Sequence, residues 1–274
     1  MNLSKLNITQ LIKLLIPPIL LQILRRLKDN RYGWKGNYNT WQEAEKNATG
    51  YDNTKILQVV KNSVLKVKNG EAIYERDSVI FDKIQYSWEL LAGLMYAGAK
   101  MGGIIKVCDF GGSLGSTYYQ NKKFLDGFKK VSWSVVEQKH FVDIGKKEFE
   151  DDELKFFYNV NESVLKEKAE ILLLSSVLQY LEKPFELLDN ILKNDFKYIL
   201  IDRTAFSRNS ETIKLQTVPP NIYEASYPCR FFDKTKFIEY FRNKNYRIIE
   251  EFDALDKANS EYEFKGFILE SITK

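Results

Sequence analysis

Histidine, cysteine and proline are scarce in this sequence of 274 residues, which contains one histidine, two cysteines and six prolines. Because His140 is the single histidine, a multi-histidine metal site is excluded, and a serine-type triad would depend on that one imidazole. Cys108 and Cys229 lie far apart and form no CxxC pair, so neither a zinc site nor a disulfide framework is indicated. We therefore expect no metal site and the reducing environment of the cytoplasm.

Charge of one sign is in only small excess, with 41 basic against 37 acidic residues and a formal net charge of +4. The excess is spread along the chain and lacks the clustered basic footprint that is typical of nucleic-acid binding. At 44% hydrophobic and 28% charged residues, the composition is that of a globular protein with one substantial core. We expect one main domain and no nucleic-acid partner.

Long hydrophobic runs are also missing, although residues 11–27 read LIKLLIPPILLQILRRL. The uncharged part extends only from Leu14 to Leu24, whereas a membrane-spanning helix needs roughly 20 residues. Pro17-Pro18 interrupts any helix there, and no small-residue cleavage site of a signal peptide follows. Two interpretations stay open for residues 11–28: a helix packed on protein, or a basic apolar segment at the inner membrane surface.

The chain divides into three predicted units: an apolar and basic N-terminal segment (1–30), a helical and aromatic cap region (31–103), and a cofactor-binding domain (104–274). The cap shows no strand pattern, and we expect helices at about 55–68 and 77–100 in it. Beyond Gly102-Gly103, short apolar runs alternate with amphipathic helical patterns, which predicts a parallel sheet. The expected strands are 104–110, 132–136, 154–158, 171–174, 198–201, 246–252 and 264–269.

A long connection, 203–232, follows the fifth expected strand. Loops of this length in a compact domain are usually functional or disordered. The aromatic residues of TVPPNIYEASYPCRFF argue against disorder. We therefore expect a functional loop at this position.

The first expected strand runs into a glycine-rich turn, Asp109-Phe-Gly-Gly-Ser-Leu-Gly115. Glycines allow close backbone approach, and the following helix offers free N–H groups to a carboxylate. Asp109 can accept hydrogen bonds from a cationic amine at the strand end. The turn therefore predicts a site for a nucleotide-like ligand with an amino-acid tail, contributed by Asp109, Gly111, Gly112, Ser113 and Gly115.

Two further strand ends supply polar side chains to the same edge of the sheet. Glu137 ends the second strand, where one carboxylate can accept both hydrogens of a ribose diol, and Gln138 follows it. Ser175, Ser176 and Val177 end the fourth strand. The three strand ends together favour a nucleotide-like cofactor over isolated turn chemistry.

These strand ends resemble those of the class I S-adenosylmethionine-dependent methyltransferases, over Ile104 to Leu269. A closer resemblance spans nearly the whole chain and is to a methyltransferase family found in bacterial O-antigen and surface-polysaccharide gene regions. It is carried by DFGGSLGSTYYQN, WSVVEQ, HFV, LLSSVLQYLEKP, IDRT, VPPNIYEASYP, WKGNYNTW and YSWELL. Gln179 departs from the wider class, in which many members carry histidine near this point.

The resemblance implies an α/β fold with a Rossmann-like sheet of about seven strands, mostly parallel with an antiparallel last strand. It also implies S-adenosylmethionine as cofactor. We expect methyl transfer to a hydroxyl of a sugar or lipid-linked glycan during surface-polysaccharide assembly, by an enzyme that is cytoplasmic or peripheral at the membrane.

A hydroxyl acceptor benefits from a general base, and Asp202, His140 and Glu182 are the candidates. Aromatic rings with polar tips are typical of sugar sites. Candidate substrate residues follow the glycine turn or lie in the long connection: Tyr118, Tyr119, Arg203, Tyr223, Tyr227 and Arg230. Residues 34–41 are expected to cover the domain or to act as a substrate lid, and Tyr158 and Asn161 to border the adenine.

Two alternatives remain open. A nicotinamide-dependent epimerase or dehydrogenase would use a related sheet, with a GxGxxG turn and a Tyr-x-x-x-Lys pair; the glycine turn here reads GGxxG. A non-catalytic scaffold could keep the fold and the cofactor site without activity, because fold alone does not decide function.

Overall fold

The structure is a computed structural model that describes residues 32–50, 53–257 and 260–272. The apolar segment 11–28, with both interpretations attached to it, lies outside these residues. Within the described ranges, no helix is long and apolar enough to cross a membrane.

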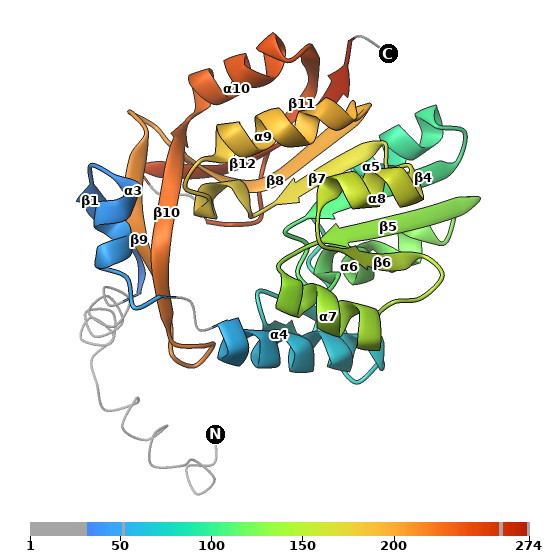
Figure 1. Cartoon of the computed structure of the whole chain (residues 1–274), viewed down its shortest axis with the longest axis horizontal. Helices are drawn as coiled ribbons and strands as arrows, with labels where there is room; N and C mark the ends of the chain where they lie inside the picture. The colour runs from blue at the N-terminus through green and yellow to red at the C-terminus, as the bar shows by residue number, and fades with distance from the viewer. Residues whose placement is uncertain (1–31, 51–52, 258–259, 273–274) are drawn as a thin grey trace, which may run out of the picture.

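Seven strands form the centre of the molecule, in the order β6-β5-β4-β7-β8-β12-β11 (Figure 1). From β6 to β8 in this order, each strand pairs in parallel with the next. β12 lies between β8 and β11 and is antiparallel to both. This order confirms the predicted Rossmann-like sheet with its antiparallel last strand. The strands are β4 (Ile104–Phe110), β5 (Lys130–Val136), β6 (Leu154–Phe157), β7 (Ile171–Ser175), β8 (Tyr198–Ser207), β11 (Tyr246–Asp253) and β12 (Tyr262–Ser271).

Helices cover both faces of this sheet, which explains the near-continuous apolar runs of its central strands. All four residues of the β7 run from Ile171 to Leu174 are buried, and they alternate between two hydrophobic cores. One core includes α4 (Asn53–Lys68), α5 (Trp88–Lys100), α6 (Ser116–Leu125) and α7 (Lys139–Glu148). The other includes α8 (Val160–Glu167), α9 (Pro184–Ile191) and α10 (Lys234–Asn243), with η2 (Leu178–Tyr180) and η3 (Leu192–Asn194) nearby in sequence.

A three-stranded antiparallel extension continues from the carboxyl end of β8, and it corrects the expectation of a long functional loop at 203–232. That segment forms the end of β8 and the hairpin of β9 (Thr212–Val218) and β10 (Ala225–Asp233). β1 (Gly33–Tyr38) pairs with β9, and the end of β10 pairs with the end of β8. A third core, around Phe231, holds the extension against β12.

The expected absence of strands from residues 31–103 is also wrong. Besides β1, this region forms a hairpin of β2 (Tyr74–Arg76) and β3 (Val79–Phe81), and its short helix α3 (Trp41–Lys46) packs on the extension. Asp77 and Ser78 make the two-residue hairpin turn with positive φ values of 52° and 70°. The second helix therefore begins at Trp88 rather than at residue 77. The division into three units stays a prediction.

Replacing Phe231 by alanine tests how firmly the extension is packed. Phe231 is fully buried and its ring lies 5.7 Å from Trp34, 4.2 Å from Tyr262 and 6.3 Å from Phe264, centroid to centroid. We expect Phe231→Ala to lower the free energy of unfolding in urea by about 3 to 5 kcal/mol. The control is Leu165→Ala on α8, where the side chain is 72% exposed and little change is expected. Equal effects of the two substitutions would contradict this packing.

Candidate functional site

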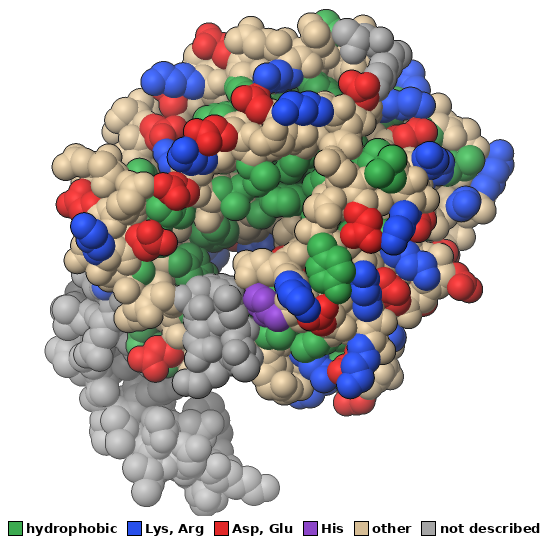
Figure 2. Space-filling model, in the orientation of Figure 1, with side chains coloured by type: hydrophobic (Ala, Val, Ile, Leu, Met, Phe, Trp, Pro, Cys, Tyr) green, Lys and Arg blue, Asp and Glu red, His purple; other side chains and the backbone are tan. Residues whose placement is uncertain are grey.

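A large cleft of about 1290 Å³ lies at the carboxyl ends of β4, β5, β7 and β8. The extension forms its opposite wall, and α4 with the β2–β3 hairpin contributes the remaining side. Figure 2 shows the molecule hollowed between the regions that Figure 1 labels β10 and α7. This is the position at which ligands bind in open α/β sheets.

The glycine turn lines one end of the cleft through Gly111, Gly112 and Ser113. A Cβ on Gly112 would lie 2.5 Å from the carboxylate of Asp109, and a Cβ on Gly111 would lie 2.5 Å from a methyl of Val177. Gly111 also has a φ of 74°. The turn therefore needs glycine at both positions, and its bare backbone leaves room for a ligand to approach closely.

Asp109 lies directly beneath this turn. Its side chain is 1% exposed and its Oδ2 accepts a hydrogen bond of 3.0 Å from the Trp133 indole nitrogen. Burial raises the pKa of Asp109 to about 7; the Trp133 bond opposes the rise and the nearby Glu137 carboxylate adds to it. Asp109 thus acts first as a buried support of the turn, and it is also one of the residues that line the cleft.

Glu137 begins the segment after β5, and its Oε2 accepts from the backbone N–H of Gln138 at 2.7 Å. The backbone N–H of Ser113 also donates to this carboxylate, which ties the glycine turn to the end of β5. Burial raises the pKa of Glu137 above its usual value despite these two bonds. Gln138, Phe141 and Tyr158 line the cleft beside it.

The end of β7 brings Ser175, Ser176 and Val177 to the same cleft. Ser176 has a φ of 52°, and its backbone N–H donates to the Asp202 carbonyl oxygen at 3.0 Å. The structure therefore brings together nine of the ten residues expected to hold the cofactor. The exception is Gly115, which does not line the cleft: it precedes α6 with a φ of 91°, and a Cβ there would meet Leu154 at 3.1 Å.

These residues fit S-adenosylmethionine on three observations. The turn is a cradle that a Cβ would fill, Glu137 offers a half-buried carboxylate at the neighbouring strand end, and aromatic Phe141 and Tyr158 lie beyond it. Glu137 would accept the ribose hydroxyls, and the turn and the start of α6 would face the amino-acid tail. Phe141 and Tyr158 would border the adenine; Asn161, expected there too, instead accepts from Asn194 at 3.0 Å.

Asp202 lies on β8, where it is the last residue that pairs with β7. It lines the same cleft as Glu137, which would accept the ribose hydroxyls. It is 3% exposed, and its Oδ1 has no hydrogen-bond partner among the described residues. Burial raises the pKa of Asp202 to about 6; Arg203 opposes this rise, while Asp256 and Glu89 add to it. A buried carboxylate with one free oxygen and this pKa suits a general base.

Arg203 is held by two carboxylates. Its Nε donates to Asp256 at 2.7 Å and its Nη1 to Asp77 at 3.2 Å, while its Nη2 contacts both carboxylates. The guanidinium thus fastens the β2–β3 turn and the β11–β12 connection to the end of β8. Arg203 therefore has a structural role through its ion pairs with Asp77 and Asp256, and this argues against its expected role in binding the substrate.

Gln179, in η2, is 1% exposed and lines the cleft next to Asp202. Its amide nitrogen donates to the Arg203 carbonyl oxygen at 3.0 Å and to Ser176 Oγ at 3.3 Å. Because its Oε1 has no partner in the described part of the chain, Gln179 presents a second free acceptor. The sequence marks this position as a departure from histidine and places Leu178 to Leu181 at the start of the wall toward the substrate, and Gln179 and Tyr180 do line the cleft.

Aromatic side chains form the wall opposite the glycine turn. Gln216 Oε1 accepts from Trp34 Nε1 at 3.1 Å and from Tyr180 at 2.9 Å, and the Tyr180 and Tyr227 rings pack edge to face. Tyr223 and Tyr227 are hydrogen-bonded to each other. All five line the cleft, in agreement with the placement expected for Tyr223 and Tyr227 and for the Trp34 end of residues 34–41.

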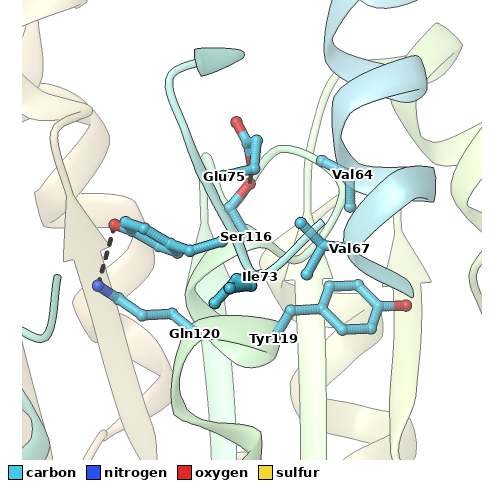
Figure 3. Close-up of a pocket in the computed structure, with 8 residues that line it drawn as sticks. Val64, Val67, Ile73, Glu75, Ser116, Tyr119 and Gln120 are labelled. Carbon is cyan, nitrogen blue, oxygen red and sulfur yellow. Dashed lines mark hydrogen bonds between the residues drawn. The ribbon is translucent and has the colours of Figure 1, made fainter. Parts of the chain in front are cut away.

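Several expected residues lie elsewhere, and we correct their placement. Tyr118 is fully buried and donates to Glu153 at 2.8 Å; Tyr119 lines a small separate pocket beside Val67 of α4 (Figure 3). His140 packs on Phe141 with a ring separation of 5.0 Å and does not line the cleft. Arg230 also lies outside the lining and donates to the Glu182 carbonyl oxygen at 2.9 Å.

Glu182, the third candidate base, reaches the cleft but is hydrogen-bonded to Gln42 of α3. Asp202 therefore has the better position, since its carboxylate is more deeply buried and keeps a free oxygen.

The sequence contains five Tyr-x-x-x-Lys spacings, of which Tyr118–Lys122 and Tyr119–Lys123 directly follow the glycine turn, as the dehydrogenase alternative requires. Tyr118 and Lys122 both bind Glu153, at 2.8 and 2.6 Å, on α6 outside the cleft. Tyr119 lies in the small pocket of Figure 3. Neither pair can meet a substrate in the cleft.

Sequence reasoning missed Asp77, Asp256 and Gln216. Asp77 was assigned to a helix; the signal that could have placed it is Asp-Ser between two short runs, YER and VIF. Gln216 joins the site only through pairing of distant segments, which spacing along the chain does not reveal.

No family model matches the sequence, and no curated protein matches it. Similar solved structures include an S-adenosylmethionine-dependent methyltransferase from Clostridium acetobutylicum ATCC 824 (8% identity, 68% of this chain, 92% of that chain, TM-score 0.46). Others are the N-terminal domain of EvdMO1 with SAH bound (12%, 81%, 97%, 0.47) and a Burkholderia thailandensis 1,6-didemethyltoxoflavin-N1-methyltransferase (14%, 82%, 92%, 0.43). These TM-scores are below 0.5, so the function is argued from the cleft.

Within the described ranges, no group of three or more His, Cys, Asp or Glu side chains could hold a metal ion.

Asp109→Asn tests the buried carboxylate. Because the pKa of Asp109 is about 7 in the folded chain and about 3.9 in an unfolded one, its contribution to stability is full below pH 4 and is lost as pH rises to 7. Asparagine does not titrate and can still accept from Trp133. From pH 5 to pH 8, we expect the stability of the variant relative to wild type to increase by about 3 kcal/mol in urea unfolding. A difference that does not change with pH would contradict the assigned pKa.

Proposed function

We propose that the protein is an S-adenosylmethionine-dependent methyltransferase that methylates a sugar hydroxyl. The observation that carries this proposal is the meeting of the glycine turn and Glu137 at adjacent strand ends in one cleft, joined by the Ser113 N–H. The NAD alternative loses support because no Tyr-x-x-x-Lys pair among the described side chains lines the cleft.

When bound, S-adenosylmethionine supplies a methyl group on a sulfonium, and in-line attack by the acceptor oxygen forms the C–O bond as the C–S bond breaks toward sulfur. Glu137 and the glycine turn orient the donor, and the aromatic wall excludes water. Asp202 Oδ1 takes the proton of the attacking hydroxyl. Much of the acceleration comes from holding donor and acceptor in line.

A sugar acceptor is supported by the wall of Trp34, Tyr180, Tyr223 and Tyr227. Their rings offer apolar faces to C–H surfaces, and the hydroxyls and Gln216 offer polar groups at the ring edges. The resemblance described above makes a glycan intermediate of surface-polysaccharide assembly the natural context. Contact of residues 11–28 with the membrane surface, and with lipid-linked intermediates, stays a prediction from the sequence.

Titration calorimetry tests the cofactor assignment. We expect S-adenosylmethionine or its product S-adenosylhomocysteine to bind and NAD not to bind. Glu137→Gln should weaken binding at least tenfold, because a neutral amide accepts the ribose diol less well. The control Glu186→Gln lies on the surface of α9, with a side chain 69% exposed, and should leave binding unchanged. Folded protein that binds neither S-adenosyl compound would refute the proposal, and binding without turnover of any sugar or glycan would favour the scaffold alternative.

The pH profile of methyl transfer tests Asp202 as base. Its pKa of about 6 belongs to a group flanked by Arg203 on β8, Asp256 on the β11–β12 connection and Glu89 on α5. Since only the carboxylate accepts a proton, kcat/KM in the free enzyme should rise with pH and level off above about pH 6. Asp202→Asn should lower kcat by about 10²- to 10⁴-fold and remove the rise of kcat/KM with pH, which is the acid limb of the profile. A variant that keeps the wild-type limb would exclude Asp202 as the base.

A further inference from the structure

The cleft is acidic although the chain as a whole is basic. Eight carboxylate side chains and two guanidinium groups line it, whereas the full sequence has a net charge of +4. Asp109 and Glu137 belong to the cofactor end. Asp202, Asp77, Asp256 and Glu182 lie toward the acceptor end, together with Arg203.

That cation is not available to an anionic ligand. Arg203 is 13% exposed, and the carboxylates of Asp77 and Asp256 occupy Nε, Nη1 and Nη2. The second guanidinium, Arg76, lies 5.6 Å from the Phe81 ring on the β2–β3 hairpin. Arg76 lies near Asp77, whose pKa it helps to lower, and its Nη1 is buried without a hydrogen-bond partner among the described residues. The lining thus holds eight carboxylates against one guanidinium outside the Arg203 ion pairs, so the cleft favours a cationic ligand group over a phosphate.

Two buried acceptors at this end have no donor. Asp202 Oδ1 and Gln179 Oε1 belong to side chains that are 3% and 1% exposed. Gln179 Nε2 donates to the carbonyl oxygen of Arg203, the residue after Asp202, and this bond leaves Oε1 as the free acceptor of the amide. Unsatisfied buried acceptors are costly, and a ligand that donates to both would remove that cost.

We propose that the acceptor is an unphosphorylated amino sugar, which donates its reacting hydroxyl to Asp202 and an adjacent protonated amine to Gln179. This inference rests on the proposed function and narrows its substrate class. The amine supplies the positive charge that the surrounding carboxylates favour, and a vicinal amino alcohol offers one donor to each of the two unsatisfied acceptors. In a larger glycan, phosphate groups would lie outside the cleft.

The test is calorimetric titration of the full chain saturated with S-adenosylhomocysteine. The probes are the 2-amino, N-acetylamino and 2-amino 6-phosphate forms of glucose, galactose and mannose. In at least one of the three series, the free amino sugar should bind at least tenfold more tightly than its N-acetylated and phosphorylated forms. Asp202→Asn and Gln179→Met should reduce that preference to about twofold or less while leaving S-adenosylhomocysteine affinity unchanged.

Gln58→Met, at an exposed position on α4, is the matched control and should keep the preference. N-acetylated or phosphorylated sugars that bind as tightly as the amino form in every series would overturn the inference, as would failure of all three amino sugars to bind. If S-adenosylhomocysteine itself does not bind, the proposed function fails. In that case, titration of the same sugars into the protein without S-adenosylhomocysteine still shows whether the cleft prefers the amino form to the N-acetylated and phosphorylated forms.

Discussion

The buried Asp109 carboxylate under the glycine turn is the constraint on which the cleft depends. It leaves no room for a Cβ on Gly112, and Val177 likewise leaves none on Gly111, so bare backbone faces the cleft where β4 ends. Trp133 on β5 holds this carboxylate, and the Ser113 N–H binds Glu137 at the end of β5. Two neighbouring strand ends thereby acquire one fixed geometry, which the proposed cofactor requires.

Backbone strain is concentrated around the same cleft. Eight non-glycine residues of the described chain have positive φ, and five of them line the cleft: Asp77, Ser78, Ser113, Ser176 and Arg203. Such conformations cost free energy and persist where the surroundings impose them, often at functional sites. Two of the five, Asp77 and Arg203, are ion-paired with each other, and the Asp77–Arg203–Asp256 ion pairs join three segments far apart in the chain. The same ion pairs neutralise the cation that an anionic acceptor would need.

The sequence predicted the sheet well because its central strands are buried on both faces and therefore appear as short apolar runs, such as Ile171 to Leu174. The residues at the cofactor end could be predicted equally well, since Asp109, Glu137 and Ser175 lie at or directly after strand ends. The residues at the acceptor end could not be predicted in this way. β1 was missed because its pairing with β9 joins residues about 180 apart, and the β9–β10 hairpin was missed because its segment was interpreted as a long loop. Tyr118 was misassigned because adjacency to the glycine turn does not say which face of α6 is buried.

The central claim is that this cleft holds S-adenosylmethionine through the glycine turn and Glu137. A crystal structure of the protein with S-adenosylhomocysteine tests it most directly. The account predicts ribose hydroxyls within hydrogen-bond distance of the Glu137 carboxylate, the amino-acid tail against Gly111 and Gly112, and the sulfur facing Asp202. A nucleoside seated elsewhere, or a ligand whose ribose does not touch Glu137, would contradict it.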